Sequence, residues 1–233
     1  MTFTVKEVIE KLKDKKQLNI SLIQREMPTG FIQAGKLFKE LQDKQYINKN
    51  NNDEYTFNKE KIEDELGIVF KPSLKILFLD IDGVLNCSTT KDKCLFYTGV
   101  EDKKIGYLKQ IVNTTKAKIV LVSTWRYTWY KEPNLKSQQD ELSTYLDDRL
   151  AEQGLSIFDK IDDEAINRGE GILDYISKLK QQEIDVDDFV ILDDEFSDYM
   201  SMRLLRYLVQ TSYKAGGLKQ KHVSKAIDIL HRN

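Results

Sequence analysis

KILFLDIDGVLN, at residues 75–86, joins a short apolar run to two aspartates and a glycine. Continuous apolar character over so few residues predicts a strand buried on both faces, as in a parallel sheet. Asp80 then stands at the carboxyl end of this strand, where open α/β sheets bind their ligands. Asp82 follows two residues later, and Gly83 permits a sharp turn there. We therefore expect a Rossmann-like α/β fold with a ligand site at this strand end.

The two aspartates of this stretch predict a bound cation. Carboxylates this close repel each other unless a cation lies between them or one of them is protonated. Mg²⁺ suits such a place, because it prefers oxygen ligands and retains positions for water and phosphate. Asp80 and Asp82 are therefore candidate metal ligands. The alternative is a strand that runs into an Asp-Gly turn without any chemistry.

The DxDG pattern at residues 80–83 resembles the first motif of the haloacid dehalogenase (HAD) superfamily of phosphatases. The resemblance implies that Asp80 is the nucleophile, which takes up the phosphoryl group as an aspartyl-phosphate. It also implies that Asp82 is the acid/base, which protonates the leaving oxygen and later activates water. Gly83 is expected beside the bound substrate.

A second apolar strand is expected at residues 118–122, and the sequence Ser123-Thr124-Trp125-Arg126 follows it. A strand that ends in Ser or Thr resembles the second HAD motif, whose hydroxyl and backbone amides donate hydrogen bonds to phosphoryl oxygens. Ser123 is the first choice for this catalytic role and Thr124 the alternative in substrate binding, while Ser123 can also cap the next helix. Arg126 either pairs with an acidic neighbour or binds a substrate phosphate, and Trp125 is a candidate core residue.

The Ser-Thr-Trp-Arg run and DxDGVLN together resemble the HAD domains of the modular "Swiss Army Knife" RNA-repair proteins, although Val122 stands where that family often has a further Ser. The apolar helix expected after Arg168-Gly169-Glu170 strengthens this resemblance. The resemblance implies that Arg168 is the basic residue of the third HAD motif, which stabilises the negative charge of the nucleophile and of the phosphate. A surface arginine without a role is the alternative.

A third strand is expected at residues 189–192, and it ends in Asp193 and Asp194. This acidic pair resembles the fourth HAD motif, which implies metal binding. Asp194 is the first choice for the metal ligand and Asp193 the second, and Asp198 is a candidate for holding a ligand water. The four motifs occur in the family's order, so residues 74–233 are identified as a HAD-like phosphatase domain. The short spacings leave room only for a minimal cap, a small lid after Asn86.

The first seventy residues predict a separate domain. Three amphipathic helices precede two short apolar pieces around the Asn-rich loop at residues 48–53, which indicates a winged helix-turn-helix at residues 1–70. Residues 19–47 are similar to the winged-helix gamma domain of bacterial DNA translocases, but they depart from it at Pro28-Thr29 and lack its arginine-rich third-helix start. DNA or RNA is therefore a candidate partner. The expected contacts are Gln33, Lys36 and Lys39 from the third helix and Arg25 and Lys49 at phosphates. The alternative is a solvated charged face on a domain that contacts protein.

The overall composition favours no partner, because charged residues make up 32% of the chain and the formal net charge is −2. Cys87 and Cys94 match no common zinc spacing, which predicts free thiols in a reducing compartment. The charged N-terminus has no signal-peptide core, and no apolar run has membrane-spanning length. We expect a cytoplasmic protein without membrane contact.

These features together predict a Mg²⁺-dependent phosphatase for nucleic-acid ends or another macromolecular phosphate, because a site without a large cap is open to bulky substrates and the first domain is a candidate for DNA binding. Three alternatives stay open at this point. One is a small-molecule phosphatase, such as a nucleotidase, whose winged helix mediates association. The others are a DNA-binding regulator with a HAD sensor domain and a HAD phosphotransferase.

Overall fold

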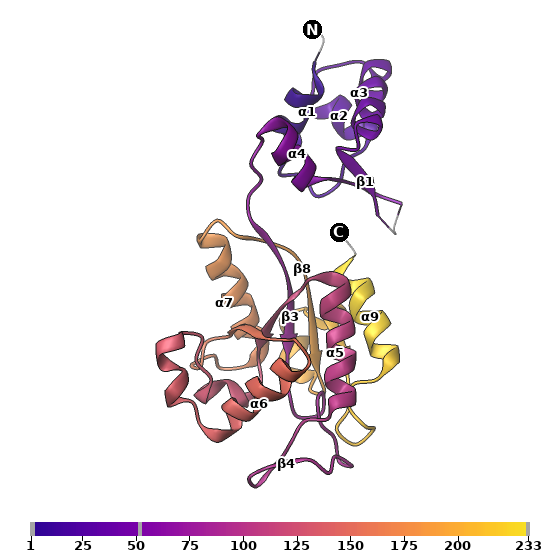
Figure 1. The fold of residues 1–233 in the computed structure, drawn as a ribbon. Helices are drawn as coiled ribbons and strands as arrows, with labels where there is room; N and C mark the ends of the chain where they lie inside the picture. Colours follow the sequence, from indigo (N-terminus) through magenta and orange to yellow (C-terminus); the bar gives the residue numbers. More distant parts are fainter. Residues whose placement is uncertain (1–2, 51–52, 232–233) are drawn as a thin grey trace. The chain divides into compact units, whose positions relative to one another are not determined.

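The computed structural model describes residues 3–50 and 53–231, which divide into two compact units between Pro72 and Ser73 (Figure 1). The elements of the N-terminal unit are α1 (Val5–Leu12), α2 (Ile20–Glu26), α3 (Phe31–Asp43), β1 (Ile47–Lys49), β2 (Tyr55–Phe57) and α4 (Lys59–Leu66). No helix among the described residues is both long and apolar enough to cross a membrane.

The N-terminal unit follows its sequence signals closely. A reciprocal cap starts α1, because Thr4 Oγ1 accepts a hydrogen bond from Glu7 N while Glu7 Oε2 accepts one from Thr4 N at 2.7 Å. Strands β1 and β2 form an antiparallel pair, and residues 51–52 of the Asn-rich loop between them lie outside the described residues. Helix α3 ends at Asp43, two residues before Gln45, which takes a positive φ of 57°. This order of elements is compatible with the winged helix-turn-helix, which stays a prediction.

The second unit is built on one parallel sheet. Its strands are β3 (Ser73–Leu79), β6 (Lys118–Leu121), β7 (Ile157–Lys160), β8 (Asp185–Asp193) and β9 (Leu208–Gln210), with a small separate pair of β4 (Lys93–Cys94) and β5 (Tyr97–Thr98). The five strands of the large sheet lie in the order β7-β6-β3-β8-β9. Every neighbouring pair is parallel. The predicted Rossmann-like α/β fold is therefore confirmed.

Helices cover both faces of this sheet. The long helices are α5 (Asp102–Thr115), α6 (Glu141–Glu152), α7 (Arg168–Gln181) and α9 (Gln220–Leu230), and the short ones are α8 (Ser197–Met200), η1 (Thr124–Thr128), η2 (Pro133–Gln138) and η3 (Leu205–Tyr207). Figure 1 shows α7 on one side of β3 and α5 with α9 on the other.

The central strand β3 supplies side chains to two separate cores. Leu77 and Leu79 pack with α5, α6 and α9, whereas Ile76 and Phe78 pack with α7 on the opposite face. Each fully buried side chain of this size contributes about 1.5–3 kcal/mol of transfer free energy. Burial on both faces explains why the sequence of this strand is an unbroken apolar run.

Several elements extend beyond their predicted bounds. Strand β8 starts at Asp185, four residues before the apolar run at residues 189–192, and its first four residues include three aspartates: Asp185 is exposed, Asp187 half-buried and Asp188 buried. The predicted lid after Asn86 contains the antiparallel β4–β5 hairpin. Cys87 and Cys94 are both buried and form no disulfide.

Candidate active site

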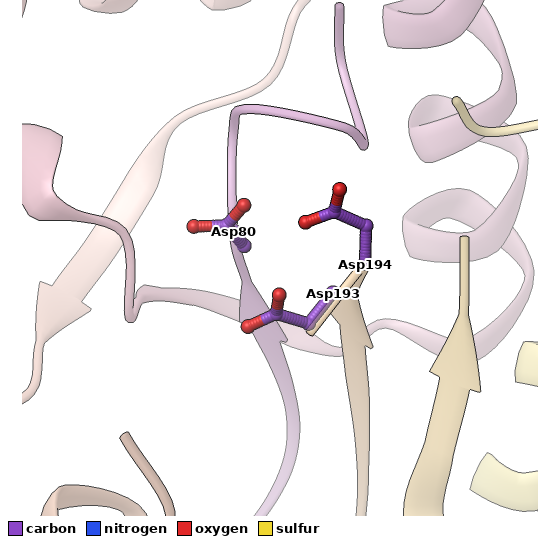
Figure 2. Close-up of side chains that lie close together, drawn as sticks. All are labelled: Asp80, Asp193 and Asp194. Carbon is purple, nitrogen blue, oxygen red and sulfur yellow. The ribbon is translucent and has the colours of Figure 1, made fainter. Parts of the chain in front are cut away.

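The carboxyl ends of three adjacent strands bring the predicted motifs together. Asp80 follows β3, Ser123 follows β6 by two residues, and Asp193 is the last residue of β8. Because β3 lies between β6 and β8 in a parallel sheet, these ends meet at one edge. Figure 2 shows the carboxyl groups of Asp80, Asp193 and Asp194 gathered at the ends of two strands. One oxygen from each lies within 4.8 Å of the others.

Asp80 is buried and only partly neutralised. Its Oδ1 lies 3.4 Å from Arg168 Nη2, and this buried oxygen has no hydrogen-bond donor among the described residues. Burial raises the pKa of Asp80 well above its usual range, and the charge of Asp193 raises it further. Arg168 and a hydrogen bond from Ser123 lower this pKa without cancelling the rise. The site therefore holds a carboxylate that needs additional positive charge.

Arg168 bridges two of these carboxyl groups from the first turn of α7. Its guanidinium lies 3.4 Å from an oxygen of Asp80 and 3.4 Å from an oxygen of Asp193. Its backbone N–H donates to Asp198 Oδ2 at 3.3 Å, which fixes the start of the helix. Burial lowers the pKa of Arg168, but the two carboxylates outweigh it and raise the pKa overall. The side chain is thus a permanent cation at the strand ends.

Asp193 and Asp194 have different surroundings, although they are adjacent. Asp193 is fully buried and accepts hydrogen bonds from the Tyr199 hydroxyl and from Glu195 N at 2.9 Å. Burial is also the main reason why the pKa of Asp193 is raised. Asp194 is half-buried, and its Oδ2 accepts a hydrogen bond from Tyr213 N at 3.3 Å.

Gly83 provides the space that Asp194 occupies. It has a positive φ of 83°, and an added Cβ would lie 2.8 Å from Asp194 Cβ and overlap the carboxyl group. Its N–H donates to Asn86 Oδ1 at 3.0 Å, and its carbonyl accepts from Thr211 Oγ1 at 2.7 Å. Gly83 is buried in this arrangement, and its predicted contact with substrate stays a prediction.

Asp82 is exposed, and two neutral donors hold its carboxylate. Asn86 Nδ2 donates to Oδ1 at 2.7 Å, and Trp125 Nε1 donates to Oδ2 at 3.0 Å. Sequence reasoning did not assign Asn86 a role and placed Trp125 in the core. Trp125 is indeed buried, but its indole N–H points to Asp82. An asparagine four residues after Asp82 in an otherwise apolar turn was the signal available for Asn86.

Ser123 both caps a helix and contacts the candidate nucleophile. Its Oγ accepts a weak hydrogen bond of 3.4 Å from Trp125 N at the start of η1, and its side chain also hydrogen-bonds Asp80. Ser123 is buried, whereas Thr124 is exposed one residue later. The two predicted roles of Ser123 are therefore compatible.

The family model for the HAD domain in Swiss Army Knife RNA repair proteins matches residues 76–223. The chain belongs to this family. It is accordingly a HAD-superfamily phosphatase, as the motifs predicted. No curated protein matches the chain. Among solved structures, a protein from Mesorhizobium loti described as a HAD-like phosphatase is similar, with 17% identity and a TM-score of 0.41 over 72% of this chain and 92% of that one.

The contacts of Arg126 in the HAD domain favour an acidic neighbour over a substrate phosphate as its partner. It is 4% exposed, and its guanidinium donates to the backbone carbonyls of Val122, Ser123 and Asp162 at 3.2–3.4 Å. Asp163 lies 3.7 Å from its Nε. This placement argues against substrate binding by Arg126, because its donors already hold the segment after β6. The alternative of an acidic partner agrees with the structure.

The donor set of the HAD domain fits a divalent cation. HAD phosphatases generally use such a metal, and three carboxyl groups within 4.8 Å offer only oxygen ligands. The buried Oδ1 of Asp80 lacks a hydrogen-bond donor among the described residues, and a cation would provide the missing partner. The raised pKa values of Asp80 and Asp193 show the same deficit of positive charge.

The predicted nucleic-acid contacts lie on α2, α3 and β1 of the N-terminal unit. Arg25, Lys36 and Lys39 are exposed, and Gln33 is half-buried. Arg25 Nε lies 3.2 Å from Glu26, and Lys49 forms an ion pair with Asp53 at 2.8 Å. The spacing of three residues places Gln33, Lys36 and Lys39 along one side of α3. Their nucleic-acid contacts stay a prediction.

Proposed function

We propose that the HAD domain is a Mg²⁺-dependent phosphomonoesterase that forms an aspartyl-phosphate at Asp80. One observation carries this proposal: a buried carboxylate at a strand end with Arg168 3.4 Å away and an oxygen that lacks a hydrogen-bond donor among the described residues. A structural carboxylate in such a place would be expected to have its hydrogen bonds satisfied. The unsatisfied oxygen of Asp80 therefore supports a role at the reacting centre rather than in the fold.

The proposed reaction takes place in two displacements. In the first, a carboxylate oxygen of Asp80 attacks phosphorus, the P–O ester bond breaks, and Asp82 gives a proton to the departing alcohol oxygen. In the second, water attacks phosphorus, Asp82 takes up the proton of that water, and phosphate leaves with Asp80 restored. Ser123 and Arg168 hold the phosphoryl oxygens, whose charge is stabilised in each displacement.

The metal site proposed for this reaction contains Asp80, Asp194 and the backbone carbonyl of Asp82, with Asp193 as the alternative carboxylate. When bound, Mg²⁺ supplies the positive charge that keeps Asp80 ionised and neutralises the phosphoryl oxygens. Arg168 supports the same charge balance from the side of α7, because it contacts both Asp80 and Asp193.

The proposed substrates are phosphates at nucleic-acid ends. The segment between β3 and α5 forms only a two-stranded hairpin, so a bulky substrate can reach the strand ends. The family that the chain belongs to is named for RNA repair proteins, which supports this substrate class. Comparing turnover of mononucleotides with that of 3′- and 5′-phosphorylated oligonucleotides tests it. A preference for mononucleotides would instead favour the small-molecule phosphatase.

We further propose that the N-terminal unit binds DNA or RNA through α3. Replacing Lys36 and Lys39 with alanine is expected to weaken binding of a duplex similarly for all sequences, because lysines at phosphates add affinity but no sequence preference. The dependence of affinity on salt should become less steep as well. Unchanged affinity and salt dependence in the double variant would assign these lysines to a solvated face.

The decisive test of the phosphatase mechanism is Mg²⁺-dependent phosphate release from a generic aryl phosphate. Wild type is expected to release phosphate, and Asp80→Asn is expected to release none, because an amide is a poor nucleophile. Asp174→Asn is the matched control, because Asp174 is an exposed aspartate on α7 outside the site. Equal loss in both variants, or none in either, would contradict the assignment of Asp80.

A further inference from the structure

The turn of the β4–β5 hairpin exposes three consecutive large side chains. Leu95 is 57% exposed, Phe96 98% and Tyr97 55%, and Phe96 is the most exposed large apolar side chain among the described residues. These side chains contribute little to folding, because they remain in water. Contiguous exposed apolar surface on a folded domain marks a place of interaction.

Leu95, in this turn, has a backbone conformation that is unfavourable for leucine. Leu95 has a positive φ of 53°, a conformation that glycine adopts readily and a bulky side chain does not. Local stability would therefore favour glycine at this position. A leucine kept in such a conformation is a feature typical of functional sites.

The base of the hairpin is linked to the candidate acid/base through the Asn86 side chain. Asn86 Nδ2 donates both to Asp82 Oδ1 at 2.7 Å and to the carbonyl oxygen of Thr98 at 3.2 Å. Val100 N donates to the Tyr145 hydroxyl at 3.1 Å, which fixes the end of the hairpin against α6. Figure 1 shows β4 beyond the carboxyl end of β3.

A short path of covalent and hydrogen bonds links the tip to the candidate acid/base. Phe96 lies two residues before Thr98, which is roughly 7 Å of extended chain at the usual rise per residue. The side chain of Asn86 donates hydrogen bonds both to the carbonyl oxygen of Thr98 and to Asp82. Only two residues of chain and the Asn86 side chain therefore separate Phe96 from Asp82 along this path.

The charge of the hairpin indicates the kind of ligand. Lys93 lies on β4, and Lys91 lies just before this strand. Both side chains are exposed, and neither forms an ion pair with another described residue. Asp92 between them lies 3.9 Å from Arg149, which partly neutralises it. Aromatic side chains beside unpaired lysines are the combination that binds single-stranded nucleic acid, by stacking on bases and by contacting phosphates.

We propose that the hairpin tip is a stacking platform for an unpaired base next to the terminal phosphate, with Phe96 under the base. Lys91 and Lys93 contact the backbone phosphates that follow. The inference rests on the proposed phosphatase function and specifies its substrate as a single-stranded end. A protein partner at the same tip is the outcome that the test must separate from it.

The test compares three substrates: a short single-stranded oligonucleotide with a terminal phosphate, the same strand with an abasic terminal nucleotide, and an alkyl phosphate. Phe96→Ala is expected to lower kcat/KM for the intact strand by roughly five- to hundredfold, the range of a lost stacking contact. The variant should leave turnover of the abasic strand and of the alkyl phosphate unchanged, because neither has an aromatic group next to the phosphate. Phe96→Trp should retain full activity, and Leu173→Ala, at an exposed apolar position of α7, is the matched control.

Two results would overturn the platform while the phosphatase function stands. One is an unchanged kcat/KM of Phe96→Ala for the intact strand, which would leave the tip to a protein partner. The other is an equal loss on the intact and abasic strands, because stacking requires a base. If wild type releases phosphate from none of the three substrates, the proposed function fails instead. Fluorescence anisotropy of the labelled strand then decides: base-dependent binding lost in Phe96→Ala supports the platform, and equal binding overturns it.

Discussion

The indole Nε1 of Trp125 lies 3.0 Å from Oδ2 of Asp82 and donates a hydrogen bond to it. The two residues come from different strand ends, since Asp82 follows β3 and Trp125 follows β6. Asp82 is exposed, so this bond and the one from Asn86 are what orient its carboxylate. The position of the candidate acid/base therefore depends on a buried aromatic residue.

Replacing Trp125 with phenylalanine should impair leaving-group protonation. The change removes a hydrogen bond to a charged group, worth about 1.5–3 kcal/mol, so kcat/KM for alkyl phosphates should fall by roughly 10- to 100-fold. Aryl phosphates should be affected less, because their leaving groups need less protonation. Trp129→Phe is the matched control, since Trp129 Nε1 donates to Asp147 at 2.9 Å outside the site. Similar losses on both substrate classes would argue against a positioning role for Trp125.

Replacing Arg168 with alanine should destabilise the fold and abolish activity. The change leaves Asp80 and Asp193 buried without their cation, which typically costs about 3–5 kcal/mol of unfolding free energy. Lys178→Ala on the same helix removes an exposed ion pair with Asp162 and should cost about 1 kcal/mol or less. Urea unfolding of both variants measures the difference. Equal stability of the two would show that Arg168 does not neutralise the buried carboxyl groups.

The metal-free protein should lose stability as pH rises through the raised pKa of Asp80. Burial makes the folded state bind this proton more tightly than the unfolded state does, so the free energy of unfolding falls between the ordinary pKa and the raised one. Asp80→Asn should flatten this decrease and be more stable than wild type at neutral pH without metal. Chemical unfolding across pH values in a chelator tests this, and a steeper decrease in the variant would contradict it.

Replacing Gly83 with alanine should weaken metal binding. The new Cβ would displace the Asp194 carboxyl group, and the positive φ of 83° adds strain. Mg²⁺ should therefore raise the melting temperature of wild type but raise that of Gly83→Ala much less. Gly106→Ala is the control, because nothing lies within 4 Å of a Cβ there and the helix should gain about 0.5–1 kcal/mol. An equal Mg²⁺ response in both variants would remove Asp194 from the proposed metal ligands.

Much of the fold follows from local sequence. The apolar run before Asp80 predicts a strand covered on both faces, and Ile76 to Leu79 do alternate between two cores. The first four residues of β8 lie outside the predicted strand, because three of them are aspartates and interrupt the apolar pattern. The sequence therefore predicted the strand boundaries well at the carboxyl ends, where burial is complete, and less well at the amino ends of the strands.

The sequence by itself determined which side chains stand at the strand ends, because a parallel sheet brings the carboxyl ends of its strands to one edge. Asp80, Ser123 and Asp193 are placed by that rule alone. Only the tertiary structure decided what those side chains contact. Trp125 and Arg126 are neighbours in sequence, yet one donates to Asp82 and the other to backbone carbonyls. Such partners come from segments that are distant in the chain, so packing rather than local pattern selects them.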